Sequence, residues 1–236
     1  MARAVALGLA VLFTALPGEA QVLSEVPTQS PRRGSLEVRF GSYRPQLDSG
    51  QEGAPFSTVF GNGGLLLGEL EFHRFFYQGF GTAGLSLGVG YAEKYGYAQL
   101  EGGGQSVERS GFHVVPLHVR GVYRLDYPAF QWGVPLVPYV KPGLVYVPWW
   151  ISKGGEIEKT ATAKGQGGKL GWDVTLGVSF LLDVLEPRLA RDFDSDLGIN
   201  HSYLFAEYTY SKVNNFGGAG FNFSDTYWMF GLALDY

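Results

Sequence analysis

Apolar residues alternate with polar or small residues along eight segments of the chain. Each segment is close to the roughly 9 to 11 residues that a tilted strand needs to cross a bilayer. Successive side chains of a strand point to opposite faces, so each segment predicts a β-strand with one apolar and one polar face. The segments are residues 35–43, 68–76, 80–91, 112–124, 135–147, 171–182, 201–210 and 226–236.

The connections between these segments differ in length in a regular way. Longer connections alternate with shorter ones, except that 183–200 is long for its position and has Pro187 placed to open one or two short helical turns. Membrane barrels have short periplasmic turns and longer outer loops. The pattern therefore predicts an all-β fold, an eight-stranded antiparallel up-and-down transmembrane β-barrel over residues 35–236, closed by its first and last strands. The longer connections are 44–67, 92–111, 148–170 and 211–225, and the other two shorter ones are 77–79 and 125–134.

The two predicted faces differ in charge. The residues assigned to one face, from Leu36, Val38 and Phe40 in the first segment to Trp228, Phe230, Leu232 and Leu234 in the last, include no charged side chain. The opposite face has acids and bases of both signs. In a membrane barrel the uncharged face meets lipid and the charged face fills the lumen, while a soluble sandwich would bury the apolar face instead, and alternation alone leaves both possible. The predicted lumen charge network is Glu37, Arg39, Glu69, Glu71, His73, His118, Arg120, Lys141, Asp173 and Glu207, with His201 on the same face.

Three prolines lie inside predicted strands. Pro116, Pro138 and Pro142 cannot donate to a strand ladder, and a closed barrel has no free edge to hold them. We expect bulges or strand ends at these positions.

The third predicted strand sends only small residues into the lumen. The long acids of the second strand can lie over them and reach Arg39, Arg120 or Lys141. An eight-stranded barrel is just wide enough to be filled by side chains, which favours a charge-paired plug. The alternative is a polar path for small solutes along this glycine-rich side. The small inward residues are Thr82, Gly84, Ser86, Gly88 and Gly90.

The beginning of the chain indicates export. An early Arg3, an apolar run over residues 4–16 and small residues at Gly18 and Ala20 predict a secretory signal peptide at 1–20. A membrane anchor is disfavoured because the run is shorter than the roughly 20 residues of a spanning helix. Residues 21–34 are then a short periplasmic lead-in to the barrel.

Composition removes several function classes. The chain has 35 glycines and 15% aromatic residues, as expected for many short strands, and no cysteine, so neither disulfides nor thiol chemistry is available. The formal net charge of −4 gives no basic surface for nucleic acid. We find no zinc spacing, calcium loop or phosphate loop, and therefore predict no metal site and no cofactor.

The last residues carry a recognisable pattern. Met229, Gly231, Leu234 and Tyr236 match the apolar-x-Gly-x-x-apolar-x-aromatic ending of bacterial outer-membrane barrels. The chain resembles small barrels of the OmpA, OmpX and OmpW type. The stretches SLEVRFGSYRP, PLVPYVKPGLVY and YLFAEYTYSK resemble a myxobacterial family of predicted outer-membrane β-barrels. The resemblance implies an outer-membrane location, contact with membrane lipid and lipopolysaccharide, and recognition of the terminal strand by the barrel-assembly machinery.

Aromatic residues gather near the ends of the predicted strands. Membrane barrels carry aromatic girdles at both interfaces, which favours a girdle here over a carbohydrate-binding surface. The predicted girdle tryptophans are Trp132, Trp149, Trp150, Trp172 and Trp228.

Candidate catalytic residues are sparse. His201 and Ser202 are adjacent in a strand and point to opposite faces, which is poor geometry for a nucleophile and its base. His113 lies near Ser106 and Ser110 at the outer rim, without an evident third orienting group. We therefore predict a non-enzymatic barrel with a structural or surface-interaction role and an unidentified surface partner. The alternatives are a small solute pore, a lipid-modifying barrel enzyme and a soluble secreted ligand-binding barrel.

Overall fold

The computed structural model describes residues 31–49, 52–99, 104–154, 156–157, 165–218 and 220–236. The predicted signal peptide and residues 21–30 of the lead-in lie outside these ranges. The strands are β1 (Gly34–Tyr43), β2 (Leu65–Gln78), β3 (Thr82–Gln99), β4 (Gln105–Val114), β5 (Leu117–Arg124), β6 (Leu136–Lys153), β7 (Glu156–Ile157), β8 (Gln166–Leu181), β9 (His201–Val213) and β10 (Asp225–Asp235). The helices are α1 (Pro55–Phe60), α2 (Tyr127–Trp132), the 3-10 turn η1 (Leu182–Val184) and α3 (Pro187–Leu197).

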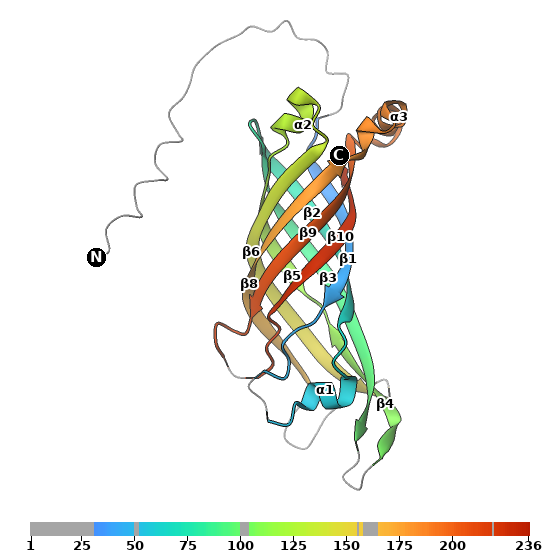
Figure 1. Ribbon diagram of the computed structural model, residues 1–236, viewed down its shortest axis with the longest axis vertical. Coiled ribbons are helices and arrows are strands. Elements are labelled where there is room, and N and C mark those ends of the chain that lie inside the picture. Colours follow the sequence, from blue (N-terminus) through green and yellow to red (C-terminus); the bar gives the residue numbers. More distant parts are fainter. Residues whose placement is uncertain (1–30, 50–51, 100–103, 155, 158–164, 219) are drawn as a thin grey trace, which may run out of the picture.

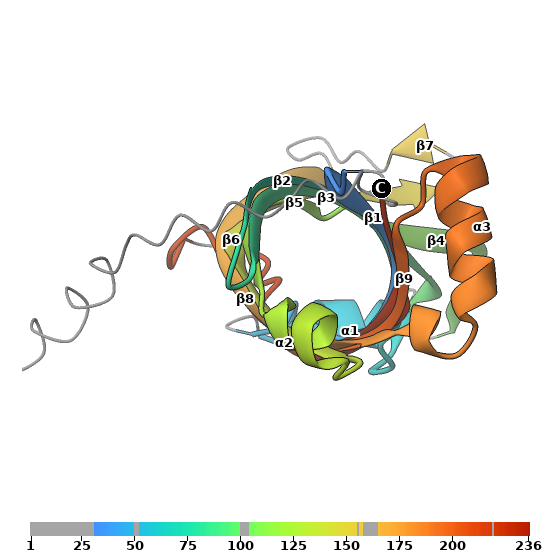
Figure 2. The same cartoon turned by 90° about the horizontal axis from the view of Figure 1, so that it is seen from above.

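The strands form one closed antiparallel ring (Figures 1 and 2). β4 and β5 share one position in it, because both pair with β3 and with β6, and β7 is a short addition to β6. Eight positions therefore make the ring. The first and last strands close it, with Leu36 opposite Leu234 and Phe40 opposite Phe230. The predicted eight-stranded barrel and its closure are confirmed.

Proline affects this ring at two of the three expected places. Pro116 separates β4 from β5, as expected, although the register against β3 and β6 continues unchanged across the break. The expectation for Pro138 and Pro142 was wrong, because both lie inside the continuous strand β6. β6 keeps its pairing with β8 at both prolines, while its pairing with β5 skips the rungs between Gly143 and Val140. Pro142 has no N–H to donate, and the β5–β6 ladder is interrupted at this position without a bulge.

The strands are longer at one end of the barrel than the sequence suggested. β3 runs to Gln99 and β4 starts at Gln105, so most of the predicted loop 92–111 is a hairpin. β6 and β8 extend in the same way into 148–170. This end also holds α1, whereas α2, α3 and the carboxyl terminus lie at the opposite end (Figure 1).

The helices lie at the two ends of the barrel (Figure 1). α3 begins at Pro187, as predicted, but its 11 residues exceed the one or two short turns expected. It lies beside the barrel wall, while α2 sits over the rim (Figure 2). Within the described residues, no helix is both long and apolar enough to cross a membrane.

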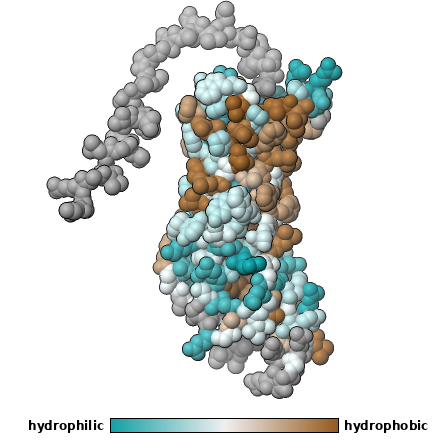
Figure 3. Space-filling model, in the orientation of Figure 1, coloured by the Kyte–Doolittle hydropathy of each residue, from teal (hydrophilic) through white to brown (hydrophobic). Residues whose placement is uncertain are grey.

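The barrel wall separates the two predicted faces. Large apolar side chains remain exposed on the outside, for example Leu87 at 61%, Leu176 at 59% and Phe230 at 59%. On the face shown in Figure 3, the apolar surface gathers toward the α2 and α3 end and polar surface covers the α1 end. A soluble sandwich would bury this apolar set, so the structure favours the lipid-facing interpretation.

Candidate functional site

The centre of the lumen is filled by charged side chains grouped around Arg39. The Arg39 guanidinium, fully buried, lies 2.6 Å from the Glu69 carboxylate and 2.8 Å from that of Glu207, and it also pairs with Glu71. Lys141 lies 2.8 Å from Glu37 and 3.0 Å from Glu207. These residues come from β1, β2, β6 and β9, so the charges connect the wall across the barrel.

A second group completes this lumen network on the β5 and β8 side. Arg120 lies 2.7 Å from Asp173 and 2.6 Å from Glu71. His118 bridges two acids, with Nδ1 2.9 Å from Asp173 and Nε2 3.1 Å from Glu69. The structure thus brings together all ten residues that the sequence singled out for the lumen, and each of them is buried.

The inward face of β3, which carries only small residues, is covered by side chains of β2. A side-chain carbon added at Gly88 would lie 3.4 Å from the Glu71 carboxylate, and one added at Gly90 would press on Glu69. The long acids of β2 therefore occupy the space that the glycines leave. This arrangement supports the plug over a solute path along the glycines.

The α2 end of the lumen holds a second ion-pair group that the sequence analysis missed. Arg124 donates to Asp235 at 2.8 Å, and Arg32 lies 2.7 Å from Asp126. Next to them, Tyr203, Phe205 and neighbouring residues form a small apolar cluster. Asp235 belongs to the eighth predicted segment and Arg124 to the fourth, so their pairing could not be read from the pattern of the chain.

The opposite end of the lumen is closed by an aromatic cap. α1 brings Phe56 and Phe60 against Phe112 of β4, with ring centroids 4.9 and 5.9 Å apart. Phe112 also stacks on Phe223 at 6.3 Å. The cap packs with Tyr43, Leu47, Leu67, Met229 and other buried residues. Along the barrel axis, charged side chains in the middle are thus followed by an apolar seal.

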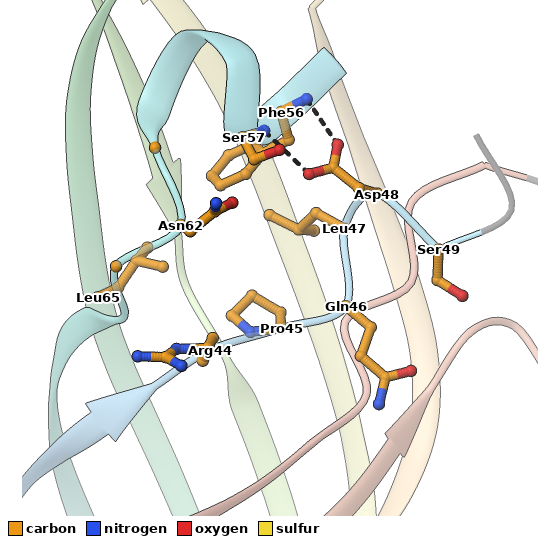
Figure 4. A pocket seen from close by; sticks show the side chains of 12 residues that line it. Arg44, Pro45, Gln46, Leu47, Asp48, Ser49, Phe56, Ser57, Asn62 and Leu65 are labelled. Carbon is orange, nitrogen blue, oxygen red and sulfur yellow. Dashed lines mark hydrogen bonds between the residues drawn. The ribbon is translucent and has the colours of Figure 1, made fainter. Parts of the chain in front are cut away.

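A pocket of about 350 Å³ lies beside the cap (Figure 4). It is formed by the connection between β1 and β2, where Leu47 and Phe56 make an apolar floor and Arg44 lies at the edge. Asp48 accepts hydrogen bonds from the backbone N–H groups of Phe56 and Ser57 at 2.7 and 2.9 Å, so it holds the start of α1 in place. The pocket is therefore a formed feature of the barrel's outer end.

Polar and aromatic residues also meet on the outer wall above the apolar band. The Ser152 Oγ lies 3.0 Å from His113 Nε2, and the Tyr91 hydroxyl lies 2.9 Å from His113 Nδ1 and 2.8 Å from Glu93. Trp150 stacks on the imidazole, with centroids 5.1 Å apart. The sequence had paired His113 with Ser106 and Ser110, whereas the hydroxyl at hydrogen-bond distance belongs to Ser152 on β6.

The predicted girdle needs one correction. Trp149 and Trp150 are adjacent in β6 and must face opposite sides. Trp150 is on the outer wall, but Trp149 points inward and packs on Phe221 with centroids 4.7 Å apart. Trp132 is 70% exposed at the α2 end. Of the other two, Trp172 packs on Tyr210 and Trp228 on Tyr208.

The terminal motif lies in the closing strand. Met229 points into the lumen beside the cap, and Gly231 pairs with Arg39 of β1. Leu234 lies on the outer face, opposite Leu36. Tyr236 extends the pairing, since its backbone N–H donates to the Gly34 carbonyl at 3.0 Å.

Comparisons with known proteins match the chain only among solved structures. No family model matches, and no curated protein does, so the likeness to a myxobacterial family stays a prediction. The chain is similar to the attachment invasion locus protein Ail of Yersinia pestis, solved with the heparin analogue sucrose octasulfate, at 12% identity over 88% of this chain and 100% of that one, with a TM-score of 0.48. The chain is also similar to the outer membrane protein OprG from Pseudomonas aeruginosa, at 15% identity over 87% of this chain and 97% of that one, with a TM-score of 0.49. For Neisserial surface protein A the identity is 13% over 86% of this chain and 97% of that one, with a TM-score of 0.45.

The architecture itself defines the class of the protein. An up-and-down barrel with an even number of strands, an apolar outer band and a polar interior is the arrangement of outer-membrane barrels. The chain is a small β-barrel of this outer-membrane type.

Proposed function

We propose that the protein is an integral outer-membrane barrel that acts as a structural or surface-interaction protein and has no enzymatic activity. Residues 1–20 would direct export and be cleaved after Ala20, leaving the barrel in contact with lipid and lipopolysaccharide. The filled lumen is the observation that carries this proposal. Three layers occupy it, namely the Arg124 group with its apolar neighbours, the charge network and the aromatic cap.

The outer end of the barrel supports an interaction role. The β3–β4 hairpin projects beyond the ring (Figure 1), and the pocket beside α1 offers a concave surface with an apolar floor and the Arg44 cation at its edge (Figure 4). Projecting loops on a rigid barrel are common sites of recognition. The partner remains a prediction without a chemical identity.

Planar-bilayer recording tests the filled lumen directly. The wild-type protein should give no stable conductance steps, and a Phe56→Ala/Phe60→Ala variant should conduct weakly, since the charge layer remains beneath the opened cap. Stable steps from the wild type that disappear in Gly88→Trp would establish the solute path instead. Glu108→Gln, at an exposed hairpin position, is the matched control.

A second candidate function rests on the residues around His113. Tyr91 can donate to Glu93 and accept from His113 Nδ1–H, which leaves Nε2 free to accept the Ser152 proton. A serine activated by a histidine whose other nitrogen is oriented is the basis of ester hydrolysis. Its position on the outer wall would suit an acyl ester of a membrane lipid.

A serine-reactive fluorophosphonate separates this candidate from the main proposal. Labelling of the wild type that is lost in Ser152→Ala and His113→Gln, but kept in Ser106→Ala, would favour the hydrolase. Absence of labelling in detergent and in lipid vesicles would leave the cluster as part of the membrane interface and support the non-enzymatic barrel.

A further inference from the structure

One corner of the lumen network brings three possible metal ligands together. Glu37 on β1 pairs directly with Glu71 on β2, and His73 follows two residues later, so the three side chains share the inward face. His73 Nε2 lies 3.3 Å from Glu37 Oε1 and 3.2 Å from Glu71 Oε1. All three side chains are almost completely removed from solvent.

In both Glu37 and Glu71, the two carboxylate oxygens have different neighbours. Glu37 Oε2 receives Lys141 at 2.8 Å, and Glu71 Oε2 receives Arg120 at 2.6 Å as well as Arg39. The Oε1 atoms of both acids are instead the ones nearest to the imidazole. Each carboxylate thus has one oxygen held closely by a permanent cation and one directed toward His73, and Glu71 Oε1 also lies 3.8 Å from Lys141 Nζ.

His73 makes no well-aligned hydrogen bond, although its Nε2 lies at ion-pair distance from both acids. Neither Nδ1 nor Nε2 has hydrogen-bond geometry with any neighbour, although the side chain is fully buried, and Glu71 Oε1 is likewise unsatisfied. Buried polar atoms without partners are costly and rare in native proteins. A nitrogen and an oxygen left unsatisfied 3.2 Å apart are placed so that one ion beside them could bind to both.

The charge balance of the network indicates the sign of that group. The ten lumen residues include five carboxylates, Glu37, Glu69, Glu71, Asp173 and Glu207, but only three permanent cations, Arg39, Arg120 and Lys141. Counting the permanent cations alone, the carboxylates of the network exceed the cations by two. Buried charge of one sign requires compensation, and a divalent cation would supply it.

We propose that His73, Glu37 and Glu71 form a binding site for a divalent transition-metal ion of the Zn²⁺ type, coordinated by His73 Nε2 and the two Oε1 atoms. Ligand bonds of about 2.0 to 2.1 Å in a tetrahedron place ligand atoms roughly 3.3 to 3.4 Å apart. The observed separations of 3.3 and 3.2 Å from Nε2 are close to this value, and the three ligand atoms lie within 4.8 Å of one another. Closing the gap between the two acids requires only a small movement of their side chains. The ion would fasten β1 to β2 in the middle of the barrel.

The site can be tested on the full barrel folded in detergent after treatment with a chelator. Zn²⁺ should bind in a one-to-one ratio and raise the unfolding temperature, and Co²⁺ should give the visible absorption of a tetrahedral nitrogen and oxygen site. His73→Gln and Glu37→Gln should both lose the Co²⁺ spectrum and at least tenfold in Zn²⁺ affinity. His118→Gln is the matched control, because it removes the other lumen histidine and should keep both signals.

Two results would overturn the proposal. The first is wild-type protein that binds neither ion when folded in their presence. The second is binding that survives in both His73→Gln and Glu37→Gln, which would locate the ion elsewhere. If one of these variants does not fold, the other decides, and either outcome leaves the bilayer test of the filled lumen unaffected.

Discussion

Removal of the central cation of the lumen should destabilise the barrel strongly. Arg39→Met keeps most of the side-chain length but leaves Glu69, Glu71 and Glu207 without their shared partner, at a position with no solvent exposure. Breaking a buried ion pair by removing one partner costs about 3 to 5 kcal/mol. Glu37, 3.5 Å from Arg39, is a fourth carboxylate partner, so we expect the upper part of that range.

The effect is large enough to measure by thermal unfolding in detergent. At about 2 to 4 °C per kcal/mol for a chain of this size, a loss of about 4 to 5 kcal/mol should lower the unfolding temperature by roughly 8 to 20 °C. Circular dichroism and the loss of heat-modifiable migration on a gel would both report it. Arg74→Met, at an exposed position on β2, is the matched control and should change the unfolding temperature little.

A second substitution distinguishes charge from packing. If unpaired carboxylates cause the loss, Arg39→Met/Glu69→Gln should be more stable than Arg39→Met alone, because one excess negative charge is removed. Two results would refute a dry, charge-paired lumen. One is a double variant whose loss of stability equals the sum of the two single losses, and the other is an Arg39→Met protein as stable as the control. Water in the lumen would reduce all of these differences together.

Three further predictions concern the two ends of the barrel. Asp235→Asn leaves Arg124 buried without its carboxylate and should cost roughly 3 to 5 kcal/mol in denaturant unfolding; an unchanged midpoint would show that solvent reaches this pair. Phe112→Ala removes the centre of the aromatic cap and should cost about 3 to 5 kcal/mol by the same assay, whereas the exposed Phe216→Ala should cost little. Deletion of Tyr236 removes backbone hydrogen bonds to Arg33 and Gly34 and should reduce the amount of barrel in the outer membrane; normal amounts would mean that this terminus is not an assembly signal.

The wall of the barrel was predictable from sequence because strand geometry is local. Alternation with a period of two assigns each side chain to a face, so the inward acids of β2 and the exposed Leu85 and Leu87 of β3 followed directly. Closure followed because a strand edge left open in lipid would have unsatisfied backbone polar groups. Which lumen residues pair with one another was less predictable. Arg39 and Glu207, for example, come from β1 and β9 and meet only because of how the strands are arranged around the ring.

The outer end was less predictable. The pattern ended β3 at Tyr91, because the residues beyond it are charged and aromatic and resemble a loop, yet they pair with β4 as far as Gln99. The aromatic cap depends on α1 meeting Phe223 from a connection far along the chain. Trp149 was assigned to the girdle by its residue type, although its place beside Trp150 required one of the two to turn inward.

Cell fractionation combined with a heat-modifiability gel tests the central claim most directly. We predict that the mature protein is found in the outer-membrane fraction and that unheated samples migrate differently from boiled ones, since a closed barrel resists detergent until it is heated. Recovery of the protein in the soluble periplasmic fraction, with identical migration before and after boiling, would contradict the membrane barrel.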